Sequence, residues 1–103
     1  LVGFGIVSRV LRSTVEEARR EGLKVGLFRP ITAWPFPSQA LVQAASRVQK
    51  VIVVELSNGQ LVEDVRLTLN GKVPVEFYGR VGGNVPSVEE VHAELTARTA
   101  SLV

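Results

Sequence analysis

Short apolar runs alternate with amphipathic stretches along the chain. Leu1 to Val7 is a nearly continuous apolar run, which predicts a strand buried on both faces. From Ser8 to Glu21 the apolar residues recur at helical spacing, and Gly22 supplies a helix stop. Lys24 to Phe28 predicts a second strand. Residues 1–28 therefore predict a strand, a helix and another strand.

The middle of the chain continues this rhythm after a loop. Arg29 to Pro37 is expected to be irregular because it contains Pro30, Pro35 and Pro37. A helix is expected to begin at Pro37 or Ser38, with an apolar stripe that consists of Leu41, Ala44, Ala45 and Val48. Lys50 to Leu56 is the clearest strand, because residues 51–54 are all β-branched.

A helix, a strand and a further helix complete the pattern. Asn58 is suited to cap a helix that Asn70-Gly71 ends, and its apolar stripe consists of Leu61, Val62, Val65 and Leu69. Val73 to Tyr78 predicts a fourth strand, and Pro74 near its start indicates an edge position. After a loop from Gly79 to Pro86, Ser87 and Glu90 match a capping box that opens the last helix.

Strands that alternate with helices predict an α/β fold with a mainly parallel sheet and helices on its faces, a three-layer α/β/α arrangement. Its crossovers should be right-handed. A chain of 103 residues suits one domain, and we expect residues 1–103 to form it. The sequence opens on an apolar run without methionine, so we expect a fragment of a larger protein.

Composition excludes several classes of function. Apolar residues make up 46% of the chain and charged residues 21%, the balance of a globular protein. The net charge of +2 is spread without a basic cluster, so we expect no nucleic-acid partner. No apolar run approaches the roughly 20 residues of a membrane span. The absence of cysteine removes thiolate chemistry and iron–sulfur ligation, and His92 alone predicts no metal site.

Polar and glycine-rich segments follow the expected strands, and they should meet at the carboxyl edge of the sheet, where ligands and partners bind. The candidates for contact with a neighbouring domain or a ligand are Arg29, Trp34, Glu55, Asn58, Gly59, Gln60, Arg80, Gly82 and Gly83. Trp34 and Phe36 either fold over the end of the core or form a docking anchor. Glu55 ends a central strand, where an inter-domain or capping role is favoured over catalysis.

No catalytic residue is predicted. Gly3 and Gly5 resemble a dinucleotide fingerprint, but they are expected inside the first strand rather than at the turn that binds a pyrophosphate. Small residues that let a helix pack closely on the strand explain them better. The loop from Gly79 to Gly83 lacks the pattern of a P-loop, and Ser57 lacks a nucleophile elbow. His92 is interpreted as a structural residue of the last helix.

Three segments are similar to those of one enzyme family. The RPIT-x-WPFP segment of 2-oxoacid:ferredoxin oxidoreductase α subunits resembles Arg29-Pro30-Ile31-Thr32-Ala33-Trp34-Pro35-Phe36-Pro37. Residues 51–61 resemble the family's strand followed by E-x-N-x-G-Q-L, although here Asn58 directly precedes Gly59. Arg80, Gly82 and Gly83 resemble the family's late R-x-G-G turn. The likeness covers nearly the whole chain.

This resemblance implies a transketolase C-terminal-like domain of an α subunit, of the pyruvate or 2-oxoglutarate type. An extra antiparallel strand would precede Leu1, and the four strands expected here would lie in the order 2-1-3-4. The parent complex would use thiamine diphosphate, magnesium, an iron–sulfur cluster and coenzyme A as substrate, converting a 2-oxoacid to an acyl-CoA and reducing ferredoxin. The domain itself would bind none of these cofactors alone.

The role implied for the domain is non-catalytic assembly. Its partners would be the remainder of the α subunit and the β subunit, with homo-oligomers as a further possibility and a cytoplasmic location. Two alternatives stay open. One is the C-terminal domain of a transketolase-like or 2-oxoacid dehydrogenase β-type subunit. The other is a free-standing flavodoxin-like module that binds a ligand at the carboxyl edge.

Overall fold

Three parallel strands form the sheet of the described residues, in the order β1-β2-β3. The structure is a computed structural model that describes residues 1–30, 36–56, 60–79 and 85–100. Its elements along the chain are β1 (Val2–Gly3), α1 (Val7–Arg20), α2 (Ser38–Ala44), β2 (Val51–Glu55), α3 (Gln60–Leu69), β3 (Val75–Gly79) and α4 (Val88–Thr99).

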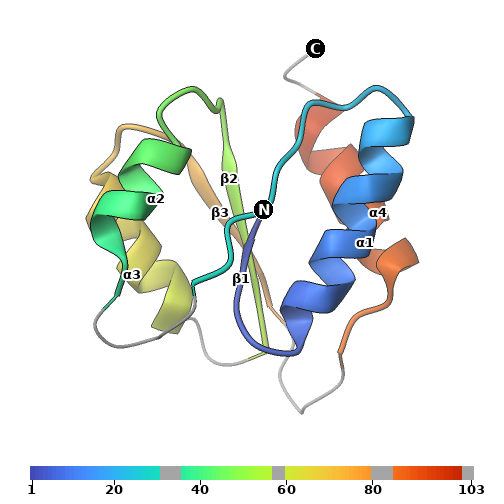
Figure 1. Cartoon of the computed structure of the whole chain (residues 1–103), viewed down its shortest axis with the longest axis horizontal. Helices are drawn as coiled ribbons and strands as arrows, with labels where there is room; N and C mark the ends of the chain where they lie inside the picture. The colour runs from blue at the N-terminus through green and yellow to red at the C-terminus, as the bar shows by residue number, and fades with distance from the viewer. Residues whose placement is uncertain (31–35, 57–59, 80–84, 101–103) are drawn as a thin grey trace.

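The helices cover both faces of the sheet, so the predicted α/β/α layering is confirmed. Figure 1 shows α2 and α3 on one side of the strands and α1 and α4 on the other. Strand β2 is fully buried, and its side chains alternate between two apolar clusters. Val51 and Val53 pack in the cluster with α2 and α3, whereas Ile52 and Val54 pack in the cluster with α1 and α4. A strand covered on both faces needs apolar residues at every position.

The second expected strand, Lys24 to Phe28, is reduced to a single parallel bridge between Phe28 and Val2. The Phe28 amide donates to the Leu1 carbonyl at 2.8 Å, and the Gly3 amide donates to the Phe28 carbonyl at 3.2 Å. This segment therefore lies beside β1, but a single bridge is not a strand, and the four-stranded order 2-1-3-4 is not confirmed among the described residues. Its partner β1 is only two residues long, which limits the ladder available to it.

The first expected strand was too long. It ends at Gly3 instead of Val7, because Gly5 has a φ of 70° and turns the chain into α1. The amide and the hydroxyl of Ser8 both donate to the Gly5 carbonyl, at 3.0 and 2.6 Å, and fix this turn. Phe4 and Ile6 consequently stand on the surface, with 43% and 63% of their area exposed.

Helix ends follow the sequence signals closely. The capping box is confirmed: the Glu90 amide donates to Ser87 Oγ at 3.1 Å, and the Ser87 amide donates to Glu90 Oε1 at 3.2 Å. Gly22 follows α1 with a φ of 91°, and Asn70 and Gly71 follow α3 with φ values of 47° and 79°. Helix α2 is shorter than predicted, because it ends at Ala44 and leaves Val48 43% exposed.

A charged network ties β3 to α4. Lys50 Nζ lies 2.8 Å from Glu76 Oε2, and Arg98 Nη1 lies 3.0 Å from Glu76 Oε1. Arg98 also pairs with Glu94 at 2.8 Å and lies over the Tyr78 ring, 5.9 Å from its centre. The hydrogen bond from Lys50 lowers the pKa of Glu76 below its ordinary value of 4.5, and the bond to Glu94 raises the pKa of Arg98.

Candidate functional site

The carboxyl ends of the three strands meet at one edge of the molecule, at the bottom of Figure 1. Three of the predicted candidates belong to the described residues there: exposed Arg29 after the Phe28 bridge, buried Glu55 at the end of β2, and exposed Gln60 at the start of α3. Six candidates lie outside the described residues, namely Trp34, Asn58, Gly59, Arg80, Gly82 and Gly83.

Glu55 is a helix cap. The residue is 8% exposed, and its carboxylate accepts hydrogen bonds from the amides of Leu61 and Val62, one on each oxygen and both at 3.1 Å. The first amides of a helix lack partners within the helix and carry partial positive charge, so a carboxylate there is favourable. Of the two roles predicted for Glu55, inter-domain contact and capping, capping is the one that these hydrogen bonds support. Asn58, the expected cap, lies outside the described residues.

A pocket of about 470 Å³ opens beside this cap. Its lining combines apolar side chains with three polar ones: Phe4, Val7, Pro30, Phe36, Leu56, Leu61, Gln60, Glu55 and Asp64. Phe36 and Leu61 also pack against the core cluster of α2 and α3. Of the two predictions for Phe36, folding over the end of the core is the one that its packing supports.

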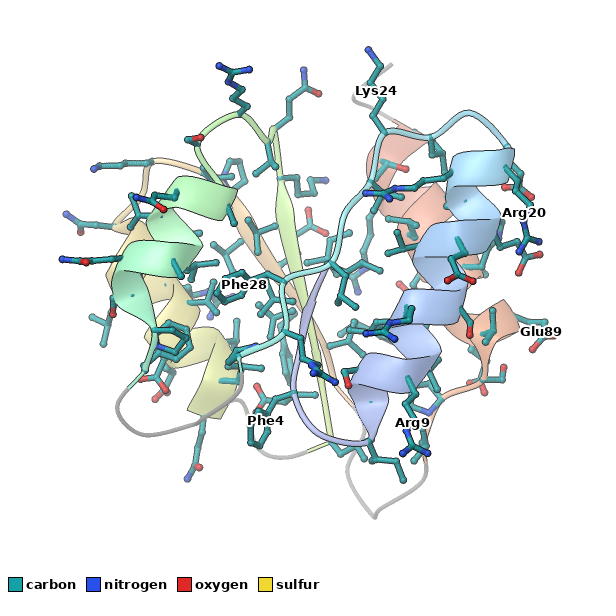
Figure 2. The ribbon with its side chains drawn as sticks, viewed as in Figure 1. Phe4, Arg9, Arg20, Lys24, Phe28 and Glu89 are labelled. Atoms are coloured by element: carbon teal, nitrogen blue, oxygen red, sulfur yellow. The ribbon has the colours of Figure 1, made fainter. Side chains whose placement is uncertain are left out.

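Phe4 and Asp64 are site residues that were not predicted from the sequence. Phe4 was assigned to a buried strand, whereas Figure 2 shows its ring at the carboxyl end of the sheet, on the side of α3. The glycines on both sides of Phe4 are a signal for a turn that could have placed it there. Asp64 lies one helical turn after Gln60 and Leu61, so the three residues share a face of α3.

The turn with Gly3 and Gly5 differs from its prediction in position. Gly3 is the last residue of β1, whereas Gly5 lies outside the strand, in the turn before α1, where a dinucleotide fingerprint has its glycines. The packing interpretation is nevertheless supported for Gly3, because a Cβ at this position would collide with the Leu11 side chain. Gly3 therefore allows α1 to lie close against β1.

His92 joins two helices. Its Nε2 lies 2.7 Å from Glu21 Oε1, and its side chain is 23% exposed. The predicted structural role of His92 is supported by this contact between α4 and the end of α1. Among residues 1–30, 36–56, 60–79 and 85–100, no group of three or more His, Cys, Asp or Glu side chains is placed to hold a metal ion. In the same residues, no helix is long and apolar enough to cross a membrane.

Comparison with known proteins gives consistent matches. The profile of the family described as pyruvate:ferredoxin oxidoreductase core domain II matches residues 1–91. The ketoisovalerate oxidoreductase subunit VorB of Methanothermobacter thermautotrophicus is 47% identical over 91 residues, which are 88% of this chain and 26% of VorB. The 2-oxoglutarate synthase subunit KorA of Methanothermobacter marburgensis is 32% identical over 91 residues, 88% of this chain and 24% of KorA.

A solved structure shares the fold. It is the 2-oxoglutarate:ferredoxin oxidoreductase from Magnetococcus marinus with 2-oxoglutarate, coenzyme A and succinyl-CoA bound. The TM-score is 0.83 at 26% identity, and the match covers 93% of this chain and 17% of that one. The chain spans about a quarter of the length of the curated relatives it matches.

Proposed function

Because the chain belongs to the pyruvate:ferredoxin oxidoreductase core domain II family, we propose that it is an assembly domain of a 2-oxoacid:ferredoxin oxidoreductase subunit. The domain comprises residues 1–103 and packs its carboxyl edge against the remainder of that subunit. The complete enzyme oxidatively decarboxylates a 2-oxoacid to an acyl-CoA and reduces ferredoxin. This family membership favours the proposal over a free-standing flavodoxin-like module.

The observation that carries the assembly role is the exposed apolar surface at the carboxyl edge. Phe4 and Ile6 flank Gly5 in the sequence, and their side chains are 43% and 63% exposed. Phe4 also lines the mostly apolar pocket. Contiguous exposed apolar surface marks sites of protein contact. Glu55, the carboxylate best placed for chemistry at this edge, is held by the amides of α3. The edge is therefore suited to docking.

The iron–sulfur cluster and the magnesium ion that the family implies have no matching set of ligands in the part of the chain that the structure describes. The absence of cysteine excludes thiolate ligation of an iron–sulfur cluster by this domain. The described carboxylates and histidine are not grouped as magnesium ligands. We therefore assign thiamine diphosphate, magnesium and the cluster to the remainder of the subunit and to a second subunit. Coenzyme A is the substrate that accepts the acyl group in the proposed reaction.

A chimera tests this proposal. The segment of the Methanothermobacter thermautotrophicus VorB subunit that matches this chain is replaced by residues 1–91. The expected result is that the chimera assembles with its partner subunits, as measured by size-exclusion chromatography, and retains 2-oxoacid-dependent electron transfer. Phe4→Asp in the chimera should prevent assembly, since it places a charge in the apolar contact. The matched control is Leu67→Asp on α3, which alters a side chain that is 78% exposed and not part of the pocket lining.

Two results would refute the proposal. One is a Phe4→Asp chimera that assembles and turns over as well as the Leu67→Asp chimera. The other is tight binding of thiamine diphosphate by the 103-residue chain alone in calorimetry, since an assembly domain should not hold the cofactor by itself.

A further inference from the structure

We propose that the pocket between Phe4 and α3 receives a basic side chain, Arg or Lys, from a neighbouring protein segment that also places an aromatic or aliphatic side chain on Phe4. This inference rests on the proposed assembly function and specifies the chemistry of the partner. The pocket's shape, its charge and its position on the domain each support it.

The apolar wall suits the stem of a long side chain and an adjacent ring. Six of the nine described lining residues are apolar, and they come from four parts of the chain: the β1–α1 turn, Pro30 with Phe36, the end of β2 and the first turns of α3. Arg and Lys bury their methylene groups on such surfaces and keep the charged head in a polar environment. The exposed ring of Phe4 offers a face to a guanidinium or a second ring.

The polar side of the pocket is negative. Among the described lining residues, Glu55 and Asp64 are the two ionisable ones, and both are acidic. Glu55 is engaged with the amides of Leu61 and Val62. Asp64 is exposed and makes no ion pair or hydrogen bond within the described part of the chain. A carboxylate beside low-dielectric walls attracts a cation more strongly than one surrounded by water.

Three observations favour a protein segment as the source of this cation. Relatives at 47% and 32% identity extend to about four times the length of the matched region, so other protein surrounds this domain in the family. Ile6, 63% exposed and outside the pocket lining, adds a second exposed apolar side chain to the turn that carries Phe4. The pocket of about 470 Å³ lies open at the carboxyl edge, where a docked segment can enter.

Short peptides test the inference on the 103-residue chain. The probes are N-acetyl-Phe-Arg amide, its neutral citrulline counterpart and its Glu counterpart, each titrated against ¹⁵N-labelled protein while amide shifts are followed by NMR. The Arg peptide should shift the amide signals of Phe4, Leu61 and Asp64. Its affinity should be about threefold to fivefold higher than that of the citrulline peptide, and the difference in affinity from the Glu peptide should be larger still.

Matched variants locate the charge. Asp64→Asn should remove the preference for Arg over citrulline, whereas Glu63→Gln should keep it, because Glu63 is also exposed on α3 but does not line the pocket. Equal binding of the Arg and Glu peptides would overturn the inference. So would equal effects of the two substitutions, or shifts that appear only through self-association, detected by sedimentation as the protein concentration rises. The two proposals can fail separately. If the 103-residue chain prefers the Arg peptide but the VorB chimera does not assemble, the pocket chemistry is supported and only the assembly function is refuted.

Discussion

At Gly3 the side chains of helix α1 lie close against the sheet, and a single methyl group there should be costly. A Cβ built on Gly3 meets the Leu11 side chain, and Leu11 is fully buried, so its methyl group has no open space to enter. Adding a methylene-sized group to a tightly packed core costs about 1–3 kcal/mol. Gly3→Ala also lowers the conformational entropy of the unfolded chain, and this effect offsets about 0.4–1 kcal/mol of the packing cost. The expected net loss is about 1–2 kcal/mol.

Gly26→Ala is the matched control for the unfolded-state contribution. Its Cβ would have Arg19 Nη2 at 3.7 Å as its nearest neighbour, an ordinary contact. This substitution should therefore be neutral or should stabilise the chain by a few tenths of a kcal/mol. Urea denaturation followed by circular dichroism measures both variants. With a slope of about 1–2 kcal/mol per molar urea, the loss at Gly3 should lower the midpoint by about 1 M.

A double-mutant cycle isolates the contact. Leu11→Ala alone should cost about 2–5 kcal/mol because it opens a cavity. In that background Gly3→Ala should become neutral or stabilising, since the added methyl group enters the space that Leu11 leaves. The coupling energy should therefore be about 1–2 kcal/mol. Equal effects of Gly3→Ala in both backgrounds, or a Gly3→Ala variant as stable as Gly26→Ala, would refute the close-packing argument.

Three further substitutions give distinct outcomes. Glu55→Gln should destabilise the chain by about 1–3 kcal/mol in urea denaturation, because an amide replaces a buried carboxylate that accepts hydrogen bonds from two helix amides. A loss of stability no larger than that of Glu63→Gln would contradict the capping role. Ser87→Ala should cost about 1 kcal/mol through the capping box of α4, and unchanged helix stability would contradict it. Glu76→Gln should destabilise the chain at neutral pH only. Because the pKa of Glu76 is lowered on folding, its stabilising contribution is present above pH 4.5 and is lost as the pH falls through the pKa of the folded state. The free energies of unfolding of the variant and the original chain should therefore converge in acid.

The sequence predicts this fold best where a local signal has one physical meaning. Residues 51–54 are all β-branched, and they form a buried strand within one residue of its expected bounds. The box of Ser87 and Glu90 and the stop at Gly22 were placed correctly, because caps depend on neighbouring residues alone. Such signals determine helices and the central strand without any long-range contact.

Prediction failed where the same pattern fits two structures. The apolar run of residues 1–7 reads as a strand, but Gly5 turns it and exposes Phe4, the residue that borders the pocket. Residues 23–27 alternate between half-buried and exposed, as in a strand, yet a two-residue partner gives this segment one bridge, at Phe28. The candidate site depended on such junctions. Glu55 could be predicted as a site residue because it lies at the end of the clearest strand. Asp64 could not be predicted, because its role depends on the position of α3 beside Phe4, which no local pattern determines.

The charged network on β3 also affects how copies of this chain behave toward one another. Among the described residues, β3 pairs with β2 on one side alone, so its other side is a sheet edge. Its neighbours Val75, Phe77 and Tyr78 would make an apolar edge strand that favours edge-to-edge aggregation. Glu76, held by Lys50 and Arg98, puts a charge at the second position of that strand. A strand that added to β3 would have to pack beside this charge, so we expect the network to disfavour edge-to-edge stacking between copies of the domain.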